Sequence, residues 1–135
     1  MAMWAVTQTH RFRASIAGAG LSNWLNYFGE NKVDQWLIPF MGKTDYDDPE
    51  LYAKSAPITF IKNVRTPTLL AVGDSDGECP APQSYEFWHA LKTLGVPTRL
   101  VLYPHEGHHF ADPSHSRDLI ERSVAWFNQY LQPAQ

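Results

Sequence analysis

The sequence of 135 residues has one cysteine, no long apolar run and no excess of positive charge, and each of these shortages excludes a class of protein. Its single cysteine, Cys79, excludes a disulfide within the chain and leaves the redox compartment open. No apolar run approaches the roughly 18 residues of a membrane span, and the first residues lack the basic and apolar regions of a signal peptide. A formal net charge of −3 provides no basic surface for nucleic acid. We therefore expect neither a membrane nor a nucleic acid as a partner, and the sequence leaves the localisation open.

The composition is typical of one globular domain. Hydrophobic residues make up 44% of the chain and charged residues 19%, a balance that gives no sign of disorder. The aromatic content is high, with five Trp, six Tyr and seven Phe. Aromatic side chains bury large areas and also line pockets, so we expect both uses here.

Segments of helical periodicity alternate with runs of strand-forming residues. The patterns predict helices over 1–9, 49–55, 83–94 and 114–131, and strands over 12–17, 68–72 and 98–103. The aromatic segment 21–40 is predicted to be a partly helical lid or pocket wall. Alternation of this kind implies parallel strands joined by right-handed crossovers, and hence the α/β class with about three strands and flanking helices.

Two polar loops follow the second and third predicted strands. The loop after residues 68–72 carries Asp76, and the loop after residues 98–103 carries His108. In parallel sheets the functional loops lie at the carboxyl ends of the strands, and neighbouring strands are about 5 Å apart. A carboxylate that holds one imidazole nitrogen leaves the other free to act as a general base. The alternative is that Asp76 is an ordinary turn residue and His108 an ordinary surface residue.

Two other chemistries compete for the same region. Residues 105–109, His-Glu-Gly-His-His, match the H-E-x-x-H pattern of zinc proteases, which requires a regular helix. A glycine within the pattern and a strand and proline before it favour a loop, so we expect no metal site and no cofactor.

Cys79 follows Glu78, and a nearby acid raises the pKa of a thiol, so we interpret Cys79 as a packed residue and not a nucleophile.

Together these motifs resemble the C-terminal part of a catalytic domain of the prolyl oligopeptidase family, near its acylaminoacyl-peptidase and dipeptidyl-peptidase branch. The resemblance covers essentially the whole chain. Its matching stretches are MAMWAVTQTHRFRASIAGAG (1–20), SAPITFIKNVRTPTLL (55–70), GDSDGECPAPQSYEFWHALKTLGVP (73–97) and YPHEGHHF (103–110). The resemblance implies an α/β-hydrolase fold in which Asp76 and His108 are the acidic and basic members of a Ser-Asp-His triad.

The resemblance also implies what these residues lack. Met1 matches the last residue of the family pattern G-x-S-x-G-G-Y-M, which places the nucleophile five residues earlier. We therefore expect residues 1–135 to be a partial α/β-hydrolase domain without the nucleophile elbow, the preceding strands or the oxyanion-hole donors. We find no G-x-S-x-G elbow in these 135 residues, and we interpret none of the serines present as a nucleophile. Glu78-Cys79-Pro80 replaces the usual Arg-Val-Pro, a departure that alters a local ion pair.

The expected activity is hydrolysis of peptide or ester bonds through an acyl-enzyme, as part of a serine peptidase. The resemblance implies that Trp24, Tyr27 and Phe28 lie near the substrate pocket, with plain core packing as the alternative. Without the nucleophile, the isolated chain is expected to be inactive. We also expect the chain to be an oligomer, a symmetric dimer joined at the open edge of the sheet or by exchanged segments. The alternative function is a non-catalytic remnant that is stable through this self-association.

Overall fold

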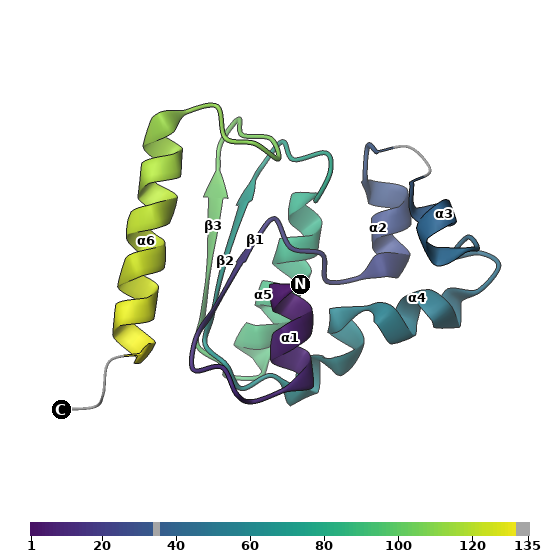
Figure 1. The fold of residues 1–135 in the computed structure, drawn as a ribbon, viewed down its shortest axis with the longest axis horizontal. Coiled ribbons are helices and arrows are strands. Elements are labelled where there is room, and N and C mark those ends of the chain that lie inside the picture. Colours follow the sequence, from purple (N-terminus) through teal and green to yellow (C-terminus); the bar gives the residue numbers. More distant parts are fainter. Residues whose placement is uncertain (34–35, 132–135) are drawn as a thin grey trace.

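The computed structural model describes residues 1–33 and 36–131. Its described part contains three strands and six α-helices, with one 3₁₀ segment between them (Figure 1). In chain order these elements are α1 (Ala2–Gln8), β1 (Ser15–Gly18), α2 (Trp24–Glu30), α3 (Leu37–Met41), α4 (Pro49–Ser55), η1 (Pro57–Asn63), β2 (Thr68–Gly73), α5 (Ala81–Thr93), β3 (Thr98–Tyr103) and α6 (Pro113–Leu131).

The three strands form a parallel sheet in the order β1-β2-β3. The central strand β2 is buried along its whole length, as its continuous apolar run predicts. Helices α1 and α5 cover one face of the sheet and α6 lies over the other, while α2, α3 and α4 form a separate cap beyond α5 (Figure 1). This arrangement confirms the predicted α/β class with three parallel strands.

Strand β1 begins at Ser15, three residues later than predicted. The register pairs Ser15 with Thr68, so a longer ladder would have to continue opposite Pro67. Proline has no backbone N–H and cannot donate to a ladder, and pairing therefore stops where the Ser15 N–H meets the Pro67 carbonyl at 2.9 Å. Phe12, which the prediction placed in the strand, is 48% exposed.

The end of α5 follows from its sequence. Gly95 adopts a φ of 71°, a left-handed conformation that glycine adopts without strain. The Gly95 and Val96 N–H groups donate to the carbonyls of Lys92 and Leu91, the paired bonds of a Schellman motif. Leu91 and Val96 then join one hydrophobic core between the sheet and helices α1 and α5.

The cap has a smaller core of its own, formed by Tyr27, Leu37 and Tyr52. Helix α4 starts where Asp48 accepts a hydrogen bond from the Leu51 N–H, as the Asp-Pro signal predicts. The predicted pocket wall over 21–40 is helical in part, as α2 and α3, and its residues 34–35 lie outside the described residues.

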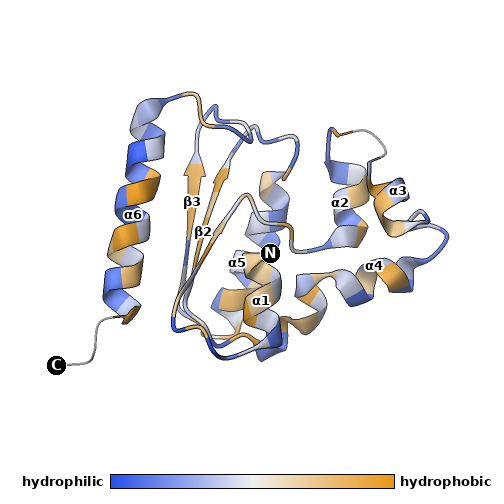
Figure 2. Cartoon of the chain, in the orientation of Figure 1, coloured by the Kyte–Doolittle hydropathy of each residue, from blue (hydrophilic) through white to orange (hydrophobic). Residues whose placement is uncertain are grey.

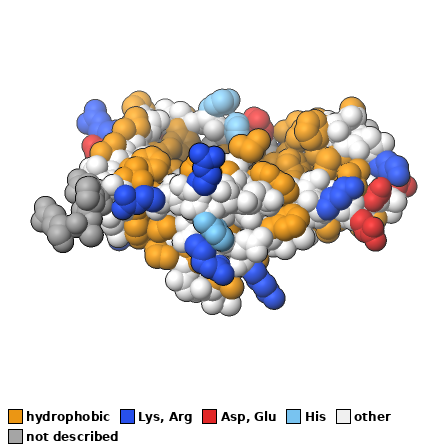
Figure 3. All heavy atoms as spheres, turned by 60° about the horizontal axis from the view of Figure 1, so that its bottom comes forward, with side chains coloured by type: hydrophobic (Ala, Val, Ile, Leu, Met, Phe, Trp, Pro, Cys, Tyr) orange, Lys and Arg blue, Asp and Glu red, His pale blue; other side chains and the backbone are white. Residues whose placement is uncertain are grey.

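Helix α6 presents much of its apolar surface to solvent. Ile120 is 64% exposed and Val124 54%, whereas Trp126 is buried against the sheet. Figure 2 shows hydrophobic positions along α6 between hydrophilic ones, and Figure 3 shows hydrophobic side chains over the left end of the molecule, where α6 lies. None of the described helices is both long and apolar enough to cross a bilayer.

Candidate active site

The carboxylate of Asp76 is held inside the loop that follows β2. Its side chain is 1% exposed, and its Oδ1 accepts hydrogen bonds from the N–H groups of Glu78 at 2.9 Å and Cys79 at 2.8 Å. Two donors on one oxygen fix the orientation of the carboxylate and satisfy its charge. The second oxygen, Oδ2, is therefore directed at a defined point.

That point is the ring of His108, in the loop between β3 and α6. His108 Nδ1 lies 3.0 Å from Asp76 Oδ2, so the two side chains meet at the carboxyl ends of β2 and β3 as expected. An ionised carboxylate only accepts, so the proton of this bond belongs to Nδ1 and the lone pair of Nε2 is free. The His108 side chain is 31% exposed, and its Nε2 is 3.9 Å from Glu78 Oε2.

The two loops are joined directly through their backbones. The Ser75 N–H donates to the Glu106 carbonyl at 3.0 Å, and the His105 N–H donates to Asp74 Oδ1 at 2.8 Å. A Cβ atom on Gly73 would overlap the Glu106 carbonyl, so only glycine permits this approach. The distance between Asp76 and His108 is thus set by main-chain contacts between neighbouring strand ends.

A cavity of about 510 Å³ opens beside the Asp76 and His108 pair. It lies between the sheet and α6, and its lining is Gly18, Ala19, Ala71, Val72, Gly73, Asp76, His108, His109, Phe110, Ser116, Leu119 and Ile120. Apart from Asp76, His108, His109, Phe110 and Ser116, the lining residues are aliphatic or glycine. An apolar wall next to an exposed imidazole nitrogen is suited to a substrate with an uncharged reacting group.

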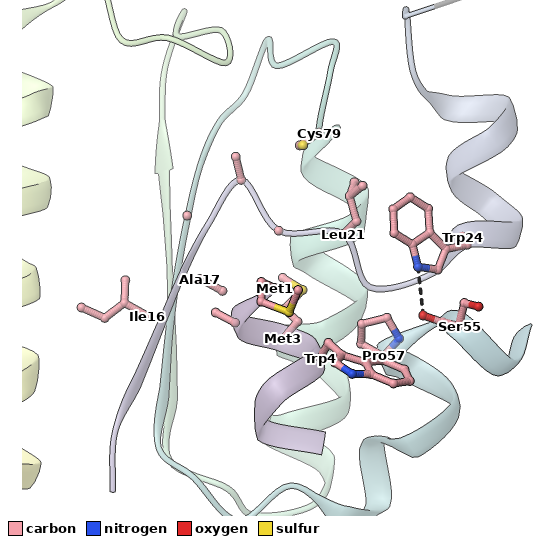
Figure 4. Close-up of a pocket in the computed structure, with 14 residues that line it drawn as sticks. Met1, Met3, Trp4, Ile16, Ala17, Leu21, Trp24, Ser55, Pro57 and Cys79 are labelled. Carbon is pink, nitrogen blue, oxygen red and sulfur yellow. Dashed lines mark hydrogen bonds between the residues drawn. The ribbon is translucent and has the colours of Figure 1, made fainter. Parts of the chain in front are cut away.

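A second cavity, of about 480 Å³, lies on the other side of β1 (Figure 4). Trp24 lines it, and its indole Nε1 donates to the Ser55 carbonyl at 2.9 Å. Tyr27 is 2% exposed within the small core of the cap, and Phe28 packs against that core, so neither lines these two cavities. Of the three aromatic residues predicted near a substrate pocket, Trp24 is the one that lines either of these two cavities.

One sequence pattern escaped the sequence interpretation. Residues 73–77, Gly-Asp-Ser-Asp-Gly, match the letters of G-x-S-x-G, the pattern of a nucleophile elbow. The structure shows no elbow there: a turn follows β2, α5 begins only at Ala81, and the Ser75 hydroxyl donates to Asp74 Oδ1 at 2.9 Å. The pattern coincides with the loop that presents Asp76, which explains why Ser75 is unsuited to the role.

Cys79 is half-buried at the wall of the second cavity. Burial, together with smaller contributions from the charges of Asp76 and Glu78, raises the pKa of its thiol to about 11. A thiol with such a pKa is protonated at neutral pH and is a poor nucleophile. The expectation from the neighbouring acids is confirmed in direction, with burial as the larger cause.

Residues 105–109 form a loop and not a helix, as their glycine and flanking proline predict. His105 has a φ of 61°, which no helix residue adopts. Within the described ranges, no three histidine, cysteine or acidic side chains are placed to hold a metal ion together. Of the residues that match the letters H, E and H, His105 lies in a turn, Glu106 is a buried carboxylate and His109 lines the cavity beside His108.

Comparison with known proteins places this geometry in a family. The family model described as "Prolyl oligopeptidase family" matches residues 1–134. The chain belongs to the prolyl oligopeptidase family. Among its relatives, the uncharacterised peptidase YuxL of Bacillus subtilis is 32% identical over an alignment of 135 positions that covers 97% of this chain and 20% of that protein. The human acylamino-acid-releasing enzyme is 31% identical over an alignment of 127 positions that covers 89% of this chain and 17% of the enzyme.

A solved structure of an acylaminoacyl peptidase shows the same arrangement. The acylaminoacyl peptidase of Pyrococcus horikoshii superposes with a TM-score of 0.90 at 28% identity, covering 98% of this chain and 22% of that one. The three parallel strands and their helices thus correspond to a C-terminal portion of an α/β-hydrolase fold. The chain spans about a fifth of the length of the relatives it matches.

The sequence interpretation missed two buried polar residues that shape the site. Glu106 is 2% exposed and binds the loop that carries His108, and Gln83 is 1% exposed and binds the start of the cap. Neither lies in a pattern that distinguishes a buried carboxylate or amide from an exposed one. Several of their partners are backbone groups, which a sequence does not display.

Proposed function

We propose that this chain supplies the Asp and His of a Ser-Asp-His triad in a serine peptidase of the prolyl oligopeptidase family. The observation that carries the proposal is the 3.0 Å contact between His108 Nδ1 and the buried Asp76 carboxylate. Asp76 fixes the tautomer and stabilises the imidazolium, and Nε2 faces outward as the base.

The proposed chemistry is acyl transfer to a serine and then to water. His108 Nε2 removes the proton of the serine hydroxyl as its oxygen attacks the carbonyl carbon, and returns that proton to the leaving amine or alcohol. A water molecule then attacks the carbonyl carbon of the acyl-serine while Nε2 removes its proton. The carboxylic acid is released, and the serine regains its proton from Nε2. We propose that the attacking serine comes from residues outside the 135 printed here, because Ser75 is held by Asp74 in a turn.

The proposed substrates are peptides and esters. The names of the relatives support this, since two are an acylamino-acid-releasing enzyme and an acylaminoacyl peptidase. Trp24 at the cavity beside β1 is proposed as part of the pocket wall, with Tyr27 and Phe28 supporting it from the cap core. In this arrangement Tyr27 acts through packing: its ring meets that of Trp24 edge-on, at 5.6 Å between centroids.

A chimera tests the proposal. The superposed segment of the Pyrococcus horikoshii acylaminoacyl peptidase is replaced by this chain, and hydrolysis of a p-nitrophenyl ester is measured. We expect His108→Gln and Asp76→Asn to lower kcat by about 10³- to 10⁴-fold with little change in KM. The matched control His89→Gln changes an exposed histidine on α5 and should retain full activity. A folded chimera in which His108→Gln is as active as its parent would disprove the proposal.

The isolated chain provides a complementary test. A fluorophosphonate probe reacts with an activated serine, and we expect no labelling of these 135 residues alone, together with no esterase activity above background. Removal of the oxyanion donors alone lowers transition-state stabilisation by about 3 kcal/mol. Stoichiometric labelling would show that a serine within this chain is an activated nucleophile, contrary to the proposal.

The alternative, a non-catalytic remnant that associates with itself, is favoured by one observation, the unpaired edge of β1. The Ser15 and Ala19 N–H groups face β2, so the intervening Ile16 N–H points away from the sheet. A second copy pairing there would form a symmetric dimer. We expect sedimentation velocity to show a dimer that Ile16→Pro, which removes this outward donor, converts to monomer. A folded wild-type monomer would rule the alternative out.

A further inference from the structure

The side chain of Glu106 closes a loop around His108. Glu106 lies two residues before His108 and is 2% exposed. Its Oε2 accepts from the Ala111 N–H at 2.6 Å, and its Oε1 accepts from the Asp112 N–H at 3.0 Å. One carboxylate thus joins the two ends of the segment 106–111, with His108 between them.

A third partner connects this carboxylate to α6. His115, in the first turn of the helix, places its Nδ1 2.7 Å from Glu106 Oε1. The His115 ring also lies against Tyr103, the last residue of β3, at 5.3 Å between centroids. The carboxylate of Glu106 is therefore bound to the start of α6 through both backbone and side-chain groups.

The backbone of Glu106 is fixed from the opposite side. Its carbonyl accepts from the Ser75 N–H at 3.0 Å, one residue before Asp76. The carbonyl lies so close to Gly73 that a Cβ atom on residue 73 would overlap it. Glu106 is thus attached by its main chain to the loop of Asp76 and by its side chain to the loop of His108.

We propose that Glu106 is a positioning residue that holds the His108 ring against Asp76, an inference that rests on the proposed function. An untethered loop of this length samples many conformations, and only a few of them place Nδ1 within reach of Asp76 Oδ2. The hydrogen bonds of Glu106 to both ends of the loop exclude most of these conformations. The bonds of its carboxylate go to Ala111, Asp112 and His115, so it acts on His108 through the backbone between residues 106 and 112.

Histidine NMR on the full chain tests the proposal without relying on activity. In wild-type protein labelled with ¹⁵N-histidine, the proposed contact predicts a downfield Nδ1 proton for His108, assigned by its loss in His108→Gln. In Glu106→Gln, an amide group must face one of the donors, and we expect that proton resonance to broaden or vanish and the ring to populate both tautomers.

Two control variants separate positioning from charge and from stability. Glu121→Gln makes the same charge change on an exposed residue of α6. Asp118→Asn weakens the bond between α6 and Tyr103 and the bond to Arg122 within α6, and so lowers stability without changing the loop. Both should retain the His108 signal. Loss of the signal in Asp118→Asn to the same extent as in Glu106→Gln would show a merely structural effect and overturn the proposal.

The outcomes distinguish the inference from the function on which it rests. A wild-type chain without the Nδ1 proton would contradict the Asp76 contact and with it both proposals. A signal that is equal in wild type and Glu106→Gln would overturn the positioning role alone. Should Glu106→Gln lose its fold, Glu106→Asp keeps the charge but shortens the side chain, so that it cannot reach both the Ala111 and Asp112 N–H groups. A broadened His108 signal in this variant supports the role, and an unchanged one overturns it.

Discussion

Gly73 and Glu106 are in direct contact, the Cα of the one against the carbonyl oxygen of the other, with no room for a side chain on residue 73. Gly73 ends β2, and Glu106 precedes the imidazole that β3 presents. The separation between the proposed acid and base is therefore determined at this contact.

Gly73→Ala is expected to push the two loops apart. The added Cβ would displace backbone, so we expect a loss of about 1–3 kcal/mol in the free energy of unfolding, measured by urea denaturation, as for an overpacked core. Gly18→Ala is the matched control, because a Cβ on this other strand-end glycine meets no atom within 4 Å. Equal stability of the two variants would contradict the proposed contact.

The stability of the chain should fall in acid, with Glu106 as one cause. Burial raises the pKa of Glu106, but bonds from Ala111, Asp112 and His115 lower it more, so its pKa lies below the ordinary 4.5. A carboxylate of this kind stabilises the fold fully above about pH 4.5, and the contribution is lost as the pH falls through the folded-state pKa. We expect the urea midpoint to fall below that pH, and less steeply in Glu106→Gln than in Glu121→Gln. Identical slopes would exclude a contribution from Glu106.

Cys79 should react slowly with thiol reagents while the chain is folded. Its pKa is raised from 9.0 to about 11, chiefly by burial. Since the thiolate is the reacting form, alkylation by iodoacetamide near neutral pH should be about 100-fold slower than in urea-unfolded protein. The rate should rise with pH throughout the mildly alkaline range. Equal rates in folded and unfolded protein would show that Cys79 is not shielded.

Gln83 should be needed to attach the cap to α5. Its buried amide oxygen accepts from the Ser22 and Asn23 N–H groups at 3.0 and 2.8 Å, and its Nε2 donates to Glu30 at 2.9 Å. Gln83→Leu leaves these donors unpaired, at about 1–3 kcal/mol for each buried one. We expect lower stability and faster amide exchange at Ser22 and Asn23. Gln129→Leu, on the exposed face of α6, is the control and should change neither.

The elements that could be predicted from sequence were those with a local cause. The start of α4 at Asp48-Pro49 and the end of α5 at Gly95 follow from capping chemistry within a few residues. Strand β2 follows from a continuous apolar run. The start of β1 could not be predicted in this way, because it depends on Pro67, a residue that becomes its neighbour only in the sheet.

The residues of the candidate site likewise include some that local sequence could predict and others that it could not. Asp76 and His108 were recognisable because each follows a predicted strand, and the carboxyl ends of adjacent parallel strands meet. The G-x-S-x-G letters of residues 73–77 were missed, but they do not mark a nucleophile, because the structure holds Ser75 in a turn. Tyr27 and Trp24 were indistinguishable as neighbours on one aromatic segment, yet one is buried in the cap and the other lines a cavity.

The sequence alone determined the α/β class, the family resemblance and the two residues proposed for the triad, because periodicity, caps and motif spacing are properties of short segments. Tertiary structure decided that Glu106 and Gln83 are buried and that the apolar residues of α6 are exposed. It also decided that Gly73 admits a neighbouring carbonyl. Burial and close approach depend on which segments pack together, and that is a property of the whole fold.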